Sequence, residues 1–157
     1  MKIFCILITS LILSNFCSAE IIKTHNPFDN SSQFISLYKN RISQYPQTLI
    51  FKKYGNDYYL LGKKPTRMIN YLSNLENPKI KIDEKYFSLD CRIYDYNFYQ
   101  NFSFKFTDEV IKEILSANSI MFQMPTLIHN KDIFIDYYQF SIPQNVLDEW
   151  KQIIAME

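Results

Sequence analysis

Apolar and polar side chains alternate between Phe87 and Phe106, and this alternation constrains the fold more than any other feature of the sequence. Before a turn near Asp95, Leu89, Cys91 and Ile93 share one parity and polar residues fill the other. After the turn, the inward parity is filled by four phenylalanines: Phe98, Phe102, Phe104 and Phe106. A period of two on both arms predicts an antiparallel hairpin with one buried face and one face in water.

The residues after this hairpin predict an amphipathic helix. Thr107 is a suitable N-cap, and Asp108 and Glu109 carry negative charge where the helix dipole is positive. The predicted buried stripe of this helix is Val110, Ile111, Ile114 and Leu115.

Two further segments repeat the order of hairpin and helix. The first has its turn at Tyr54–Asp57, and Pro65 suits the first position of the helix that follows. The inner side of that helix is predicted to be Met68, Leu72 and Leu75. The other segment has its turn at residues 129–132, and Pro143 opens a helix that places Trp150 in or beside the core. The strand returning to it, Ile133–Ile142, is apolar on both parities, which predicts a central or bulged strand.

The last two units align without gaps at an offset of 36 residues (140 − 104), so that Phe104 matches Phe140 and Val110 matches Val146. An internal duplication explains this match. A general likeness among strands that lead into capped amphipathic helices also explains it, and we favour this second explanation.

These units predict an α+β fold in which an antiparallel sheet of about five to six strands carries its helices on one face. A flexible leader is expected over residues 20–27. An N-terminal helix is expected over residues 31–45, because apolar residues recur there near helical spacing. These residues are Phe34, Leu37, Tyr38 and Ile42.

The first residues of the chain predict a secretory signal peptide, residues 1–19, that is removed. Lys2 precedes an apolar run from Ile3 to Leu13. As a helix that run rises only about 16 Å, which is too short to cross a bilayer. Cutting after Ala19 leaves one mature domain, residues 20–157, exported to the periplasm or secreted, with no stable membrane span.

The alternative reading of this region is a lipoprotein acylated at Cys17. That modification requires small residues immediately before the cysteine, whereas Asn15 and Phe16 occupy those positions. We therefore favour cleavage after Ala19, which discards Cys5 and Cys17 and leaves Cys91 as the one thiol.

The mature chain is electroneutral, since removal of Lys2 leaves 16 basic residues (17 − 1) against 16 acidic ones. A neutral chain has no general attraction to nucleic acid or anionic lipid. Abundant Lys, Ile, Asn, Tyr and Phe with only 2 glycines indicate an AT-rich genome, most simply a bacterial one.

Motifs for catalysis and for metal or cofactor binding are not found, so no catalytic residue, metal ligand or cofactor is assigned. Cys91 and His129 offer a thiol and an imidazole, but Cys91 shares the inward parity of the phenylalanines, where burial raises a thiol pKa. With two glycines, the chain has no phosphate-binding loop. A carboxylate pair is the alternative that remains, because acids from distant strands can meet in a fold. The candidates are Asp90, Asp95, Asp132 and Asp136.

The wet face of the second hairpin is the best candidate site. Tyrosine gives a large contact area at small entropic cost, and arginine and asparagine add adaptable polar contacts. The alternative is that these tyrosines only support cross-strand pairing on a solvated face. The candidate binding residues are Tyr86, Asp90, Arg92, Tyr94, Tyr99, Asn101 and Lys105.

Basic residues of the first hairpin form two separate pairs and no single patch. The predicted turn places Lys53 opposite Tyr58 and Lys63 opposite Thr48, about 13 Å along the ladder from Lys52. We interpret them as charges that protect an exposed edge strand.

The sequence therefore predicts a small, exported, non-enzymatic protein that binds a protein of the cell envelope or extracellular space, such as an inhibitor or immunity-type protein. An exported hydrolase with a carboxylate pair and a structural envelope component are the alternatives.

Overall fold

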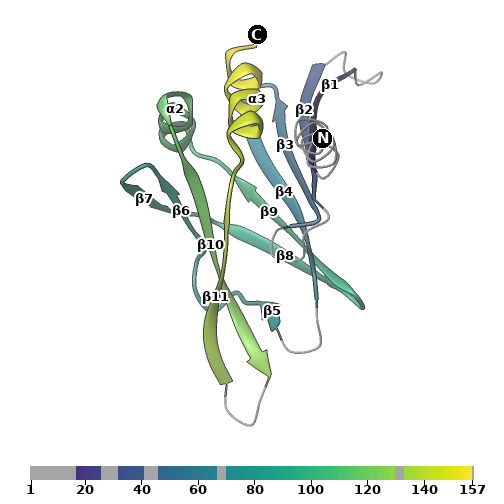
Figure 1. The fold of residues 1–157 in the computed structure, drawn as a ribbon, viewed down its shortest axis with the longest axis vertical. Helices are drawn as coiled ribbons and strands as arrows, with labels where there is room; N and C mark the ends of the chain where they lie inside the picture. Colours follow the sequence, from purple (N-terminus) through teal and green to yellow (C-terminus); the bar gives the residue numbers. More distant parts are fainter. Residues whose placement is uncertain (1–16, 26–31, 41–45, 67–69, 130–132, 157) are drawn as a thin grey trace, which may run out of the picture.

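In the computed structural model, the chain forms two antiparallel sheets that pack face to face, with helices gathered at one end (Figure 1). The structure describes residues 17–25, 32–40, 46–66, 70–129 and 133–156. The strands are β1 (Cys17–His25), β2 (Ser32–Asn40), β3 (Thr48–Tyr54), β4 (Asp57–Pro65), β5 (Asn70–Leu72), β6 (Lys79–Ile82), β7 (Lys85–Ser88), β8 (Cys91–Tyr96), β9 (Tyr99–Lys105), β10 (Ile120–His129) and β11 (Ile133–Ser141). The helices are α2 (Asp108–Ser116) and α3 (Gln144–Ala155).

One sheet has six strands in the order β1-β2-β3-β4-β9-β8. The first predicted hairpin is confirmed in position and register, since β3 and β4 place Lys53 opposite Tyr58 and Lys63 opposite Thr48. Gly55 occupies the turn with a positive φ of 56°, a conformation that costs glycine little. Both strands lie inside the sheet, so the interpretation of their lysines as edge protection is wrong.

The other sheet has five strands, in the order β11-β10-β6-β7 with β5 also paired to β10. The segment Phe87–Ile93, predicted to be one arm of a hairpin, is divided between the two sheets. Its first part belongs to β7, which pairs with β6, and its second part belongs to β8, which pairs with β9. The pairing of β10 with β11 is confirmed, but β11 lies at a sheet edge and is not central.

Aromatic rings fill the space between the sheets. The Phe104 ring of β9 stacks on Phe122 of β10 at a centroid distance of 5.7 Å, and Phe102 lies 6.3 Å from Phe140 of β11. The inward parity predicted for Phe102, Phe104 and Phe106 is confirmed, since none is more than 4% exposed. Phe98 is 81% exposed, because it lies in the turn between β8 and β9 and not on a strand.

Polar side chains occupy the same interface near β5. The Gln100 amide of β9 accepts from Leu72 N at 2.5 Å and donates to Leu72 O at 3.3 Å, and thus joins the two sheets. The Lys64 ammonium lies 5.3 Å from the centre of the Tyr138 ring, and burial lowers the pKa of this lysine. The interface between the sheets therefore changes from aromatic to polar along its length.

Both predicted helices after strands β9 and β11 are confirmed. In α2, the Thr107 hydroxyl accepts from Val110 N, as expected of an N-cap. Leu115 is the exception to its predicted stripe, being 44% exposed. In α3 the apolar stripe predicted from the sequence is buried, with Trp150 at 1% exposure; its residues are Val146, Leu147, Trp150, Ile153 and Ile154. Among the helices of the described residues, none combines the length and the hydropathy needed to cross a bilayer.

Helix α3 is held at its C-terminal end by side chains from the six-stranded sheet. Lys53 Nζ donates to Met156 O and Tyr58 Oη to Ile154 O, which satisfies carbonyls that a helix end leaves unpaired. Lys151 Nζ donates to Ala117 O at 2.6 Å and ties α3 to the end of α2.

The predicted N-terminal helix over residues 31–45 is wrong, because its described part is strand β2. The sheet buries every second residue there: Phe34, Ser36 and Tyr38. Ser36 is tolerated inside because its hydroxyl donates to Glu149 Oε2 of α3 at 2.7 Å. A buried serine masks the strand period, and the spacing of the remaining apolar residues then resembles that of a helix.

Two other local predictions are also corrected. The helix expected to start at Pro65 is not found in the described residues, because β4 continues through Pro65 and residues 70–72 form β5, which pairs with β10. Met68, from the predicted inner side of that helix, lies outside the described residues. Part of the expected flexible leader, residues 20–25, pairs with β2 as strand β1. The proposed cut after Ala19 falls within β1 and would leave its last six residues (20–25) in the sheet.

The predicted arrangement of helices on one face of a single sheet is not found. Helix α3 packs on β1, β2 and β3, but the second sheet covers the rest of that face through β10 and β11. The structure is an α+β fold dominated by two antiparallel sheets. The β3–β4 and β8–β9 hairpins lie side by side in the six-stranded sheet, and the β10–β11 hairpin of the other sheet packs against β9.

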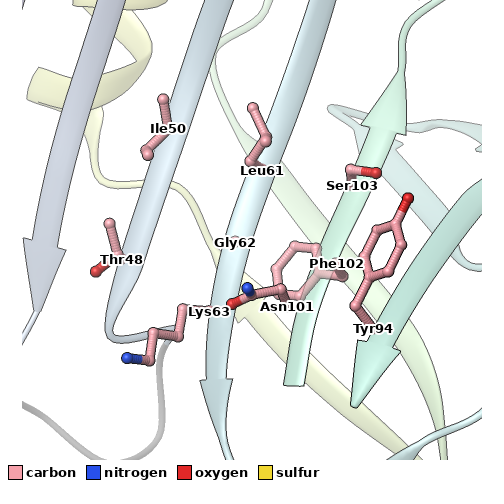
Figure 2. A pocket seen from close by; sticks show the side chains of 9 residues that line it. All are labelled: Thr48, Ile50, Leu61, Gly62, Lys63, Tyr94, Asn101, Phe102 and Ser103. Carbon is pink, nitrogen blue, oxygen red and sulfur yellow. The ribbon is translucent and has the colours of Figure 1, made fainter. Parts of the chain in front are cut away.

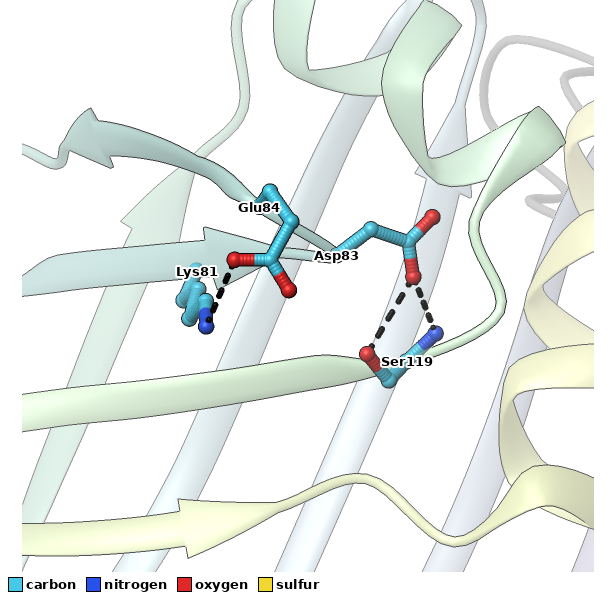
Figure 3. A network of polar contacts seen from close by, with 4 residues as sticks. All are labelled: Lys81, Asp83, Glu84 and Ser119. Atoms are coloured by element: carbon cyan, nitrogen blue, oxygen red, sulfur yellow. Dashed lines mark hydrogen bonds and ion pairs between the residues drawn. The ribbon is translucent and has the colours of Figure 1, made fainter.

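The turn between β6 and β7 is fixed by an aspartate (Figure 3). Asp83 has a φ of 49°, a left-handed conformation that aspartate adopts more readily than most residues. Its carboxylate accepts from Asn118 N at 3.0 Å, and from Ser119 N and Oγ at 2.8 and 3.2 Å. The hydrogen bonds from Asn118, and then those from Ser119, lower the pKa of Asp83, although partial burial opposes them.

Replacing Asp83 with asparagine tests this turn. Asparagine tolerates the same φ and keeps one acceptor oxygen, so the change removes mainly the charge. Because the folded pKa of Asp83 is depressed, its stabilisation is fully present above the unfolded pKa of about 3.9 and is lost as pH falls through the folded pKa. We expect Asp83→Asn to be less stable than the wild type in urea at neutral pH, with the difference vanishing in acid.

The matched control for this turn is Glu84→Gln. Glu84 forms an ion pair with Lys81 at 3.3 Å, but its side chain is 92% exposed, so the pair contributes little. A pH-independent loss of stability in Asp83→Asn, or an equal loss in Glu84→Gln, would contradict this account.

Candidate functional site

The outer face of the six-stranded sheet is the side turned away from α3 and from the second sheet. Most of the candidate binding residues project from this face. Arg92 and Tyr94 come from β8, and both are exposed. Tyr99 and Asn101 of β9 are half-buried, and Lys105 at the end of β9 is exposed. The two strands bring these five residues together because Arg92 pairs with Ser103 and Tyr94 with Asn101.

Two predicted members come from outside β8 and β9, and of these only Tyr86 is away from the site, because Asp90 shares a hollow with Arg92 and Lys105. Tyr86 is 65% exposed on β7, in the other sheet, where it pairs with Lys81 on the face away from the core. Asp90 lies between β7 and β8 and is exposed. The alternation in the sequence therefore includes Tyr86. However, the chain passes from one sheet to the other between β7 and β8, so Tyr86 and Tyr94 lie in different sheets.

A pocket of about 450 Å³ opens in the outer face (Figure 2). Its apolar walls are Ile50 of β3, Leu61 of β4 and Tyr94 of β8. Leu61, on the interior strand β4, is 38% exposed, and Tyr94, on the edge strand β8, is 51% exposed. Together they form an exposed apolar surface on this face. The other lining residues are Thr48, Gly62, Lys63, Asn101, Phe102 and Ser103.

Gly62 lies in the floor of this pocket. The Phe102 ring lies directly against the Gly62 backbone on the inner side of the sheet, and a Cβ added to Gly62 would stand 2.0 Å from Phe102 Cζ. Glycine is thus required here by the close approach of the ring. The neighbours of Gly62 in β4, which are Leu61 and Lys63, point outward and line the pocket (Figure 2).

Sequence reasoning missed the contribution of the first hairpin to this site. The pairing of β4 with β9 places Leu61 beside Ser103 and Lys63 beside Asn101. Leu49 and Leu60 are buried, and successive side chains of a strand point to opposite faces, so Ile50 and Leu61 point outward. This alternation within β3 and β4 was the sequence signal that could have predicted their place on the outer face. The contact between the two hairpins is long-range and has no local sequence signal.

The outer face carries more positive than negative charge. Among the described side chains that its strands direct outward, two are acidic, Glu20 and Asp57, whereas five are basic: Lys39, Lys52, Lys63, Arg92 and Lys105. Asp90, just before β8, adds a third acid near Arg92. Lys63 Nζ lies 3.7 Å from the centre of the Tyr99 ring, a cation–π contact that fixes the lysine beside the pocket.

Lys105 is already paired. Its ammonium lies 2.8 Å from Asp57 Oδ1, and Tyr59 Oη donates to the other oxygen of Asp57 at 3.1 Å. The hydrogen bond with Lys105 lowers the pKa of Asp57, and the same bond raises the pKa of Lys105. This pair is exposed, so it orders the side chains more than it stabilises the fold.

A second hollow, of about 660 Å³, lies beside the pocket towards the start of β8. Its lining is polar, with Arg92 and Lys105 as cations and Asp90 as an acid. The remaining lining residues are Tyr59, Asn77, Cys91, Ser103 and Phe104.

Cys91 faces inward beside Phe104 and is half-buried. Burial raises the pKa of its thiol to about 12, and a hydrogen bond to the Ser103 backbone opposes this shift only partly. A cysteine with a raised pKa is a poor nucleophile at neutral pH, which agrees in direction with the expectation from its inward parity. The side chain of His129 lies outside the described residues.

The candidate acids are dispersed among separate elements. Asp95 accepts from Gln100 Nε2 at 2.5 Å, Asp136 is exposed on β11, and Asp132 falls outside the described residues. In the part of the chain that the structure describes, no group of three or more His, Cys, Asp and Glu side chains is placed to hold a metal ion.

Comparison with known proteins adds no relative to this description. No family model, no curated protein and no solved structure matches the chain.

Proposed function

We propose that this chain is an exported, non-enzymatic protein that binds another protein through the outer face of its six-stranded sheet. The observation that carries the proposal is the pocket between Ile50, Leu61 and Tyr94, an apolar cavity on an exposed sheet face. Exposed apolar surface rimmed by polar groups is typical of protein-binding sites. Export is supported by the signal-like segment at Ile3–Leu13.

The composition of the face favours a protein partner with an acidic surface. Tyrosine and arginine are enriched among the residues that dominate binding energies, and both flank the pocket as Tyr94 and Arg92. Five basic side chains against three acidic ones, Asp90 included, would be complemented by carboxylates on the partner. A second copy of this chain is disfavoured, because a symmetric contact through the same face would bring like charges together.

Differential capture of partners tests the proposal. We expect immobilised wild-type protein to retain a partner from its native envelope fraction, and Leu61→Ser and Tyr94→Ala each to weaken that binding at least tenfold, since central apolar anchors contribute about 2 kcal/mol or more. The intact mass of the native protein tests export, because a mature start at Glu20 is expected and an acylated Cys17 would contradict it.

Two matched variants serve as controls. Leu115→Ser changes an exposed leucine on α2, and Tyr86→Ala changes an exposed tyrosine on the opposite face of the molecule. Both are expected to retain the partner fully. Equal losses in the control and the outer-face variants, or unchanged binding in Leu61→Ser and Tyr94→Ala, would refute the assignment of this face.

A further inference from the structure

The apolar pocket and the polar hollow are neighbours on one surface. Ser103 lines both of them, and Tyr59, Arg92 and Lys105 of the hollow also point to the outer face. The pocket offers apolar walls, and the hollow offers charged groups of both signs. The two together form a groove with an apolar end and an end that carries Arg92.

The groove runs across the strands and not along them. Ile50, Leu61, Ser103 and Arg92 occupy one row over β3, β4, β9 and β8, because each is the register partner of the next. Neighbouring strands are about 4.8 Å apart, so Leu61 and Arg92 are separated by about 10 Å. The row therefore fixes the distance between an apolar anchor and a positive charge.

Arg92 is the available cation in this row. Its side chain is exposed, and within the described residues it makes no ion pair and no side-chain hydrogen bond. Lys105 differs, since Asp57 holds its ammonium at 2.8 Å. A guanidinium offers two parallel N–H donors, which match the two oxygens of a carboxylate.

The charges around Arg92 disfavour a dianion. The charged groups at the polar hollow are Arg92 and Lys105, with Asp57 bound to the lysine and Asp90 on the lining, so the hollow has no net positive charge. Arg92 forms no ion pair among the described residues, so its guanidinium can pair with the single charge of a carboxylate. A phosphate monoester adds nearly two negative charges and would face Asp90 and Asp57.

We propose that the groove binds an extended segment of the partner in which an apolar residue and an aspartate or glutamate stand two positions apart. Residues i and i+2 of an extended chain point to the same side and are about 7 Å apart. When the apolar residue of the segment lies between Leu61 and Tyr94, its carboxylate stands about 7 Å further along the row. The long side chain of Arg92 covers the difference from the roughly 10 Å that separates Leu61 and Arg92. This inference rests on the proposed function and specifies the chemistry that the outer face recognises.

The probes are blocked pentapeptides of sequence Ser-Leu-Thr-Glu-Ser, with glutamate replaced by glutamine, lysine or phosphoserine, or leucine replaced by serine. Each is titrated into isotope-labelled protein, and the backbone amide shifts of Leu61, Ser103 and Arg92 are followed. We expect the Leu/Glu peptide to bind with a dissociation constant on the order of millimolar. The glutamine, phosphoserine and serine peptides should each bind about five- to tenfold more weakly, and the lysine peptide weakest of all.

Variants separate the two ends of the groove. Arg92→Gln should remove the preference for glutamate over glutamine and leave the preference for leucine over serine intact. Leu61→Ser should weaken the Leu/Glu and Leu/Gln peptides equally. Lys112→Gln removes a positive charge at an exposed position of α2 that lines neither the pocket nor the hollow, and it should change neither preference.

Three results would overturn the inference. These are equal affinities for the glutamate and glutamine peptides, tighter binding of the phosphoserine peptide, and absence of saturable shifts at the groove with every peptide. In each case, loss of the native partner in Leu61→Ser would still support the outer face as the binding surface. Retention of that partner in Leu61→Ser and Tyr94→Ala would instead refute the proposed function itself.

Discussion

Replacing Trp150 with alanine is expected to lower the free energy of unfolding by about 3–5 kcal/mol. The indole is 1% exposed, and its ring stacks on Phe51 of β3 at a centroid distance of 4.7 Å and an angle of 14°. Removing it leaves a cavity between α3 and the six-stranded sheet. A loss of this size is a large part of the 5–15 kcal/mol that typical domains possess, so partial unfolding of α3 is also expected.

Urea denaturation followed by far-ultraviolet circular dichroism measures this effect, because Trp150 is the only tryptophan of the chain and its fluorescence is lost in the variant. Trp150→Phe keeps an aromatic ring against Phe51 and should lose less than the alanine variant. Gln152→Ala, at an exposed position of the same helix, should change stability by about 0.5 kcal/mol or less. A loss below about 1 kcal/mol in Trp150→Ala would show that α3 is not docked as described.

The Cys91 thiol is expected to react with iodoacetamide about 50-fold more slowly in the folded protein than in the chain unfolded by guanidinium. Burial raises its pKa from 9.0 to about 12, which reduces the thiolate fraction about a thousandfold. The more basic thiolate is intrinsically more nucleophilic, which raises its rate constant about 20-fold. The net effect is therefore a rate about 50-fold lower. Replacing Cys5 and Cys17 with serine leaves Cys91 as the single thiol and makes the rates unambiguous.

The control for this measurement moves the thiol by one residue. In the variant Cys91→Ser with Arg92→Cys, the thiol stands on the outer face of β8 and should react at a rate close to that of the unfolded chain. Similar slow rates at both positions would mean that the two faces of β8 do not differ in burial. A fast rate for Cys91 in the wild type would contradict its inward position.

Local signals in the sequence predicted the elements whose identity depends on neighbouring residues. The turn at Gly55 fixes the register of β3 and β4, and Thr107 with its acidic neighbours fixes the start of α2. Trp150 and its stripe predicted the buried side of α3. In each case the deciding contacts lie within a few residues or within one helical turn.

Local signals failed where a distant partner changes the cost of burial. Ser36 would be unfavourable inside a sheet, but Glu149 of α3 accepts its hydrogen bond, so β2 forms where the spacing suggested a helix. Residues 70–72 join β10 as a strand because that edge offers backbone partners and Gln100 satisfies Leu72. Neither partner is near in sequence.

The candidate site shows the same division. The inward and outward parities of β8 and β9 were determined by the sequence alone, because a period of two with phenylalanine on one parity leaves one stable orientation. The grouping of Arg92, Tyr94, Asn101 and Lys105 follows from it.

Only the tertiary structure decided which sheet each strand joins. That choice sent Tyr86 to the far side of the molecule and brought Ile50 and Leu61 beside Tyr94 to form the pocket. The free energy that selects among sheet pairings comes from contacts between residues many positions apart, such as Phe104 with Phe122, and no short stretch of sequence contains it.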